Sequence, residues 1–330
     1  MYRTILLTVL CSGFVHAQTP SKIVASANVF ISSLTAEQRA KVLFEFNDST
    51  QRKKWSNLPV TMAPRAGLKL GDLSAGQRNA AMGLVESALS ARGYQKVLAI
   101  VEGDEALKQA SGERGASMFG RDLFYISVLG KPSVKEPWML QFGGHHLALN
   151  ITMVGREGIL TPSLTAAQPA KYTVAGKTVR PLGAENDKAF LLINALDEEQ
   201  RKKAILNYKV ADLVLGPGKD GKTIQPEGLP CSVMKTNQQA MLLDLMGEWA
   251  GIVYEPAAAA RMAEIKANLG ETWFAWSGPT TNGSAAYYRI QGPTVVIEYA
   301  PQPLGGDPTM HIHTIYRDPT NDYGKKSAAQ

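Results

Sequence analysis

The chain has 330 residues, of which 45% are hydrophobic and 19% are charged, so it can bury a substantial core and is not an intrinsically disordered protein. Its formal net charge of +6 comes from Lys and Arg residues spread along the whole chain. Because binding to nucleic acid requires a concentrated basic face, these numbers argue against a nucleic-acid partner.

The first 17 residues, MYRTILLTVLCSGFVHA, have the pattern of a cleavable secretory signal. A basic residue precedes an apolar stretch, and small residues lead up to a cleavage site after Ala17. The apolar stretch is too short to cross a bilayer as a stable helix, and no later segment is apolar enough to do so. We therefore expect a periplasmic or secreted protein that begins at Gln18 and keeps one cysteine, Cys231, which leaves no intrachain disulfide.

Helix starts recur along the chain. In segments 34–39, 73–78 and 196–201 a Thr, Ser or Asp follows a Leu and stands three residues before a Gln, which is the pattern of an N-cap with a capping box. A weaker fourth copy at 235–239 leads into an amphipathic helix. The recurrence has two interpretations, an internal repeat or the general similarity of good helix starts, and the irregular spacing of the four copies favours the second.

Strand-like segments are rich in β-branched and aromatic residues and are bounded by Gly and Pro; they are 122–130, 138–155, 272–278, 285–300 and 311–318. Gln291-Gly292-Pro293 interrupts one of them as a hairpin turn would. Because helices and strands occur in blocks, we predict an α+β fold, with amphipathic helices packed on a mainly antiparallel sheet. We expect residues 18–330 to form a single domain, with a possible seam at the Gly- and Pro-rich loop 215–230.

The histidines are scarce and clustered. Of five in the chain, four form two pairs, His145 with His146 and His311 with His313. Residues two apart on a strand face the same side, so His311 and His313 project together. His145 and His146 read as strand residues on opposite faces, unless a bulge at the preceding Gly143-Gly144 brings both to one side.

Imidazoles from two neighbouring strands would form a site for a divalent transition metal. We expect zinc, with iron or copper as alternatives, and an open position for water. Four imidazoles could equally donate hydrogen bonds or exchange protons with a small-molecule ligand, or be hydrogen-bonded core residues.

Polar residues near the second pair are candidates for the remaining roles. Glu298 and Asp318 could orient an imidazole or act as a general base, and Arg317 could hold an anionic group of a substrate. An ion pair of Arg317 with Asp318 or Asp322 that fixes the final turn is the structural alternative. Asn150, Asp322 and Tyr323 are candidates for substrate binding.

The motifs WxxQFGGHHLALN (138–150) and HIHxIYRDPxNDYG (311–324), with a segment around Tyr172, resemble the secreted proteins of domain of unknown function family 3500. The resemblance covers most of the mature chain and implies an exported single-domain protein without an established reaction. It places on the family pattern His145, His146, Asn150, His311, His313, Arg317, Asp318, Asp322 and Tyr323.

The leading hypothesis from these residues is an exported metal-dependent hydrolase that activates water at His145, His146, His311 and His313. The alternatives are an iron or copper oxygenase and a non-catalytic periplasmic protein that binds metal or carbohydrate.

Overall fold

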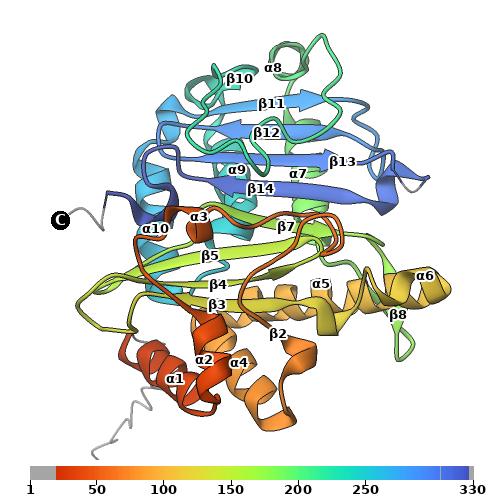
Figure 1. Ribbon diagram of the computed structural model, residues 1–330. Helices are drawn as coiled ribbons and strands as arrows, with labels where there is room; N and C mark the ends of the chain where they lie inside the picture. Colours follow the sequence, from red (N-terminus) through yellow and green to blue (C-terminus); the bar gives the residue numbers. More distant parts are fainter. Residues whose placement is uncertain (1–19, 305, 327–330) are drawn as a thin grey trace, which may run out of the picture.

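The computed structural model describes residues 20–304 and 306–326, so the expected signal sequence at 1–17 lies outside the described residues. The protein has the predicted α+β fold, with a large, mainly antiparallel sheet (Figure 1). In this part of the chain no helix is long and apolar enough to cross a membrane. The α-helices are α1 (Pro20–Ser32), α2 (Ala36–Val42), α3 (Ser49–Arg52), α4 (Ala75–Ser87), α5 (Ala91–Ala110), α6 (Gly112–Ala116), α7 (Gly183–Ala195), α8 (Glu198–Ala204), α9 (Thr236–Ala250) and α10 (Glu255–Ala267).

The sheet has the strand order β1-β3-β4-β5-β7-β14-β13-β12-β11-β10, with β2 beside β3 and β6 beside β5. Only the pairing of β1 with β3 is parallel among the strand pairs of the described residues. The strands are β1 (Leu43–Phe44), β2 (Leu68–Lys69), β3 (Tyr125–Leu129), β4 (Trp138–Gly144), β5 (Leu147–Val154), β6 (Glu157–Ile159), β7 (Ser163–Ala167), β10 (Leu229–Pro230), β11 (Trp273–Ser277), β12 (Tyr287–Gln291), β13 (Val296–Pro301) and β14 (Ile312–Arg317), and β8 (Tyr172–Val174) pairs separately with β9 (Lys177–Val179).

Each predicted strand segment contains one or two of these strands. The hairpin predicted at Gln291-Gly292-Pro293 joins β12 to β13, and the Gly292 N–H donates to the Val295 carbonyl at 2.8 Å. Segment 138–155 also contains two strands, β4 and β5, with residues 145–146 as the turn between them.

The chain contains a structural repeat. In the first half α1, α2, β2, α4 and α5 precede the strands β3, β4, β5 and β7; in the second half α7, α8, β10, α9 and α10 precede β11, β12, β13 and β14 in the same order. The halves meet where β7 pairs with β14 (Figure 1). The two copies of the meander therefore form one continuous sheet.

Two details repeat at the level of atoms. Gln38 and Gln77, which are 39 residues apart, exchange side-chain amide hydrogen bonds, and so do Gln200 and Gln238, which are 38 apart. Each of these glutamines also accepts a hydrogen bond from the N–H of its helix N-cap residue. The four helix starts are thus two copies of one pair, and the interpretation favoured by their irregular spacing was wrong because it compared all four as a single series.

The second detail is a glycine before β2 and before β10. Gly67 has φ +94° and Gly228 has φ +95°, a region that favours glycine. A Cβ at either position would lie 2.3 Å from a carbonyl oxygen of the neighbouring strand, that of Ile126 or of Phe274. The same close approach of the chain is therefore required in both halves.

The sheet has two different faces. One packs against helices, and α5, α7 and α9 lie behind it in Figure 1. The other is crossed by two long connections, residues 45–67 with α3 and residues 206–228, which occupy equivalent places in the two halves. The predicted loop 215–230 covers the end of the second connection and β10, inside the second half of the chain. A domain seam at this loop remains a prediction.

Candidate functional site

The first histidine pair forms the turn of a hairpin. Gly144 pairs with Leu147, so His145 and His146 are the two turn residues, and His146 has φ 61°. The prediction that both lie on a strand was wrong, because the apolar run continues through a turn that lacks the usual turn residues. Gly143 is needed for a close approach, since a Cβ there would lie 2.4 Å from the Leu147 carbonyl oxygen.

The second pair lies at the start of a central strand. His311 directly precedes β14 and His313 belongs to it, and their rings are 4.8 Å apart between centroids. The two side chains project to the same side, as their spacing predicted. Since β14 pairs with β7, and β7 pairs with β5, the start of β14 is brought to the β4–β5 turn.

Three imidazoles converge at this point. His311 Nε2 lies 3.1 Å from His146 Nε2 and 3.1 Å from His313 Nε2, and all three residues are buried. Their ligand atoms lie within 4.8 Å of one another, an arrangement that could hold a metal ion. Bonds of 2.0–2.1 Å in a tetrahedral zinc site put neighbouring ligand atoms about 3.3 Å apart, which the two spacings from His311 match closely.

Outer contacts orient two of the rings. His311 Nδ1 lies 2.7 Å from the Leu304 carbonyl oxygen, and His313 Nδ1 lies 3.4 Å from Asp212 Oδ1. Because a carbonyl oxygen only accepts, His311 carries its proton on Nδ1 and presents the lone pair of Nε2 to the cluster. Hydrogen bonding of this kind fixes the imidazole tautomer that a metal requires.

Burial keeps two of the three imidazoles uncharged. Desolvation lowers the pKa of His146 well below its ordinary value, and the neighbouring imidazoles lower it further. Desolvation is also the main cause that lowers the pKa of His311 to about 4. Both rings are therefore neutral at pH 7, and their lone pairs are available to a metal ion.

His145 lies outside this three-imidazole cluster. Its Nδ1 lies 2.7 Å from Asp104 Oδ1 on α5, and its ring stacks on that of His146 with centroids 3.7 Å apart. Asp104 is fixed in turn by the Gly120 N–H, which donates to its other oxygen. His145 thus braces His146 from the helix side of the sheet.

Asn57 reaches the cluster from connection 45–67. Its carbonyl oxygen accepts from the His146 N–H at 3.1 Å, and its Nδ2 lies 3.4 Å from His313 Nε2. Sequence reasoning missed Asn57, Asp104 and Asp212. Each is an isolated polar residue in a loop or a helix, far along the chain from any histidine, so no local sequence pattern indicated it.

The structure does not bring the predicted catalytic residues to the cluster. Glu298 is fully buried and accepts from the Val214 and Leu215 N–H groups and from the Tyr287 hydroxyl, each at 2.7 or 2.8 Å. Its position therefore anchors connection 206–228, and a catalytic role for it stays an untested prediction.

Arg317 is four residues beyond His313 on β14, which is about 13 Å along a strand. It donates to the Leu215 and Gly216 carbonyls and pairs with Asp322 at 2.8 Å, in agreement with the structural alternative for the final turn. Asp318 pairs with Arg261 at 3.0 Å and accepts from the Thr320 and Asn321 N–H groups. These contacts hold the end of the chain in place, and catalysis by either residue stays a prediction.

Two residues predicted to bind substrate, Asp322 and Tyr323, belong to the same end of the chain. Asp322 accepts from the Asp318 N–H, and the Tyr323 hydroxyl donates to Asp220 and accepts from the Trp55 indole.

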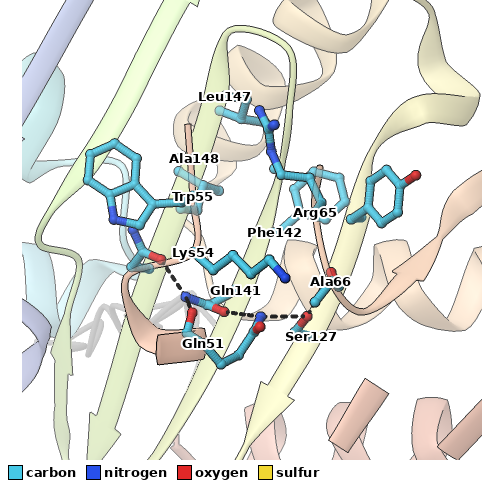
Figure 2. A pocket seen from close by; sticks show the side chains of 14 residues that line it. Gln51, Lys54, Trp55, Arg65, Ala66, Ser127, Gln141, Phe142, Leu147 and Ala148 are labelled. Carbon is cyan, nitrogen blue, oxygen red and sulfur yellow. Dashed lines mark hydrogen bonds between the residues drawn. The ribbon is translucent and has the colours of Figure 1, made fainter. Parts of the chain in front are cut away.

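Asn150 lines a small pocket on the loop-covered face of the sheet, shown in Figure 2. Gln141 donates to the Asn150 side chain at 3.0 Å and accepts from Gln51, which reaches Ser127. The cavity has a volume of about 30 Å³, enough for one or two water molecules. These amides form a chain of hydrogen bonds between connection 45–67 and the sheet, and a substrate contact of Asn150 stays a prediction.

The comparisons with known proteins agree with the resemblance of the motifs. No curated protein and no solved structure matches the chain. The family model described as a protein of unknown function, DUF3500, matches residues 16–325, nearly the whole length. The chain therefore belongs to the DUF3500 family.

Proposed function

We propose that the protein is a metal-dependent hydrolase in which His146, His311 and His313 bind one divalent ion. The ion that we propose is zinc. The observation that carries the proposal is the convergence of three buried imidazoles, with His311 Nε2 3.1 Å from the Nε2 atoms of both His146 and His313. A bound zinc ion acts as a Lewis acid and lowers the pKa of a coordinated water, which makes it a nucleophile at neutral pH.

The ligand set supports zinc. Three imidazoles without a carboxylate are the ligands of one class of catalytic zinc site, whereas non-haem iron oxygenases commonly use two histidines and a carboxylate. The fourth histidine, His145, turns its Nδ1 to Asp104. Three ligands leave a position for water, which a site saturated by four histidines would not.

The chain itself contributes three functions. Burial keeps His146 and His311 neutral, and Leu304 and Asp212 orient His311 and His313. The Asn57 amide beside His313 can donate a hydrogen bond to an oxygen of the substrate. The Asp212 side chain is 59% exposed and that of His313 is 9% exposed, so the cluster lies just beneath the surface on this side.

Metal analysis of untagged protein tests the site. We expect elemental analysis by mass spectrometry to find about one equivalent of zinc per chain. A His311→Ala, His313→Ala double variant should contain almost none, and circular dichroism should show that this variant is folded. The proposal is contradicted if the wild-type protein contains no metal and also fails to bind added zinc, copper, iron or manganese.

Turnover tests the reaction. We expect the zinc-loaded protein to hydrolyse at least one of p-nitrophenyl acetate, p-nitrophenyl phosphate, p-nitrophenyl glucoside and leucine p-nitroanilide, and the double variant to hydrolyse none of them. If zinc binds at one equivalent but the wild type is no faster than the double variant on all four compounds, the protein is a metal-binding protein and the hydrolase assignment fails.

A further inference from the structure

A second cavity lies at the other end of the central strands. The imidazoles gather at the start of β14, whereas this cavity is lined by Tyr316 and Asp318 at the end of β14, together with β6 and α10. Its volume is about 590 Å³, which is within the range of small-molecule sites. None of the residues discussed under the proposed function lines it.

One wall of the cavity is apolar. Ile159 and Leu160 face Val253 and the small residues Ala257 and Ala260 of α10. The alanines leave room where larger side chains would fill the space between the helix and β6. This wall suits the hydrocarbon part of a ligand.

The charges around the cavity balance. Three cationic residues line it, Arg156, Arg261 and Lys326, and three anionic residues, Glu157, Glu264 and Asp318. A ligand with one net charge would upset this balance, whereas a ligand that carries both a carboxylate and an ammonium group meets a partner of opposite sign for each.

Arg261 is held rigidly as part of this wall. Its Nε donates to the Tyr316 hydroxyl at 2.8 Å, and its Nη1 lies 3.0 Å from Asp318 Oδ2. Its side chain is only 14% exposed, and that of Asp318 only 6%. Arg261 Nη1 also lies 2.6 Å from Glu264 Oε2, so one cation and two carboxylates are fixed side by side before any ligand binds, which lowers the entropic cost of binding.

We propose that this cavity binds a small apolar molecule that is both a carboxylate and an amine, namely a free apolar amino acid or a short apolar peptide. The apolar part lies against Ala257 and Ala260, and the charged ends meet Arg261, Asp318 and the other charged residues that line the cavity. This site is independent of the imidazole cluster.

Calorimetric titration with four probes tests the ligand class: L-leucine, L-leucyl-L-leucine, N-acetyl-L-leucine, which has no ammonium group, and isoamylamine, which has no carboxylate. We expect leucine or the dipeptide to bind, and the two singly charged compounds to bind at least tenfold more weakly. The stronger of the first two probes distinguishes the amino acid from the peptide. No binding of any probe, or equal binding of a singly charged compound, overturns the proposal.

Adjacent alanines on α10 locate the site. Ala259 and Ala260 are both exposed, but only Ala260 lines the cavity. We expect Ala260→Leu to reduce the affinity for the best probe by at least tenfold and Ala259→Leu to leave it unchanged. Binding that is equal in these two variants would place the probe elsewhere and refute the proposed site.

Discussion

His145 and His146 are neighbours in the chain but have different partners. His146 Nε2 joins the cluster, whereas His145 Nδ1 is bound by Asp104. Replacing a metal ligand and replacing a residue that only supports the ligand reduce the metal affinity by different amounts. The two adjacent histidines therefore form a matched pair for mutation.

His146→Gln should lose the metal, because it leaves two ligands. His145→Gln should keep about one equivalent but bind it about 10- to 100-fold more weakly, as is usual when a residue supporting a ligand is changed. Competition with a chelator of known affinity measures both constants. If His145→Gln alone abolishes binding while His146→Gln does not, the assignment of the two residues is reversed.

The lowered pKa values of His146 and His311 predict a pH dependence of the metal-free protein. In the unfolded chain these rings take up a proton near pH 6.5, whereas His311 in the folded chain does so only near pH 4. The unfolded state therefore binds more protons in this window, and the free energy of unfolding should fall as the pH decreases from about 6.5 to about 4.

Urea unfolding at several pH values measures this dependence. The slope between pH 6.5 and 4 should be smaller in His311→Gln than in the wild type, because one of the titrating rings is absent. An unchanged slope would show that His311 does not titrate as its burial implies.

At the scale of elements, connection 206–228 positions one side of the site. Asp212 contacts His313. Two residues after Asp212, the N–H groups of Val214 and Leu215 donate to the Glu298 carboxylate. Arg317 holds the same segment by its carbonyls. Glu298 is thus linked to the cluster through the loop that it anchors.

Glu298→Ala should free this connection, since it leaves buried N–H groups without an acceptor at a cost of about 1–3 kcal/mol each. We expect faster hydrogen exchange in residues 206–228 and weaker metal binding. Glu199→Ala is the control, because Glu199 is an acid on the surface of α8 that is 77% exposed and pairs with the exposed Lys202. Normal exchange and metal content with lost hydrolysis would instead support Glu298 as the catalytic base.

At the scale of the whole molecule, a buried ion cluster joins the two halves of the repeat. Lys96 on α5 contacts the Glu185 carboxylate on α7 and lies 3.4 Å from Glu248 Oε2 on α9. Glu185 is fully buried, and desolvation raises the pKa of its carboxyl group above the ordinary value, although Lys96 opposes this. Lys96 therefore favours the charged form of this carboxylate at the junction, against the effect of desolvation.

Lys96→Met should destabilise the protein by about 3–5 kcal/mol, because it leaves an uncompensated charge in the interior. Lys41→Met is the matched control: Lys41 pairs with Glu37 on the surface and its removal should leave the melting temperature nearly unchanged. Equal melting temperatures of the two variants would show that the buried cluster does not stabilise the junction.

The sequence alone determined the local elements and the histidines of the site. Capping patterns located α2, α4 and α8, the β-branched and aromatic runs located the strands, and the spacing of His311 and His313 predicted their common direction. These features depend on neighbours within a few residues, so they can be read directly from the chain.

Only the tertiary structure decided which residues meet. His146 and His311 are 165 residues apart, and their contact depends on the pairing of β7 with β14 across the repeat. The pairing of β13 with β14 places Glu298 opposite Ile315, and the two long connections bring Asn57 and Asp212 to the imidazoles. Strand order and loop paths arise from long-range burial, which no local pattern encodes, and so the sequence named the histidines while the fold selected three of them.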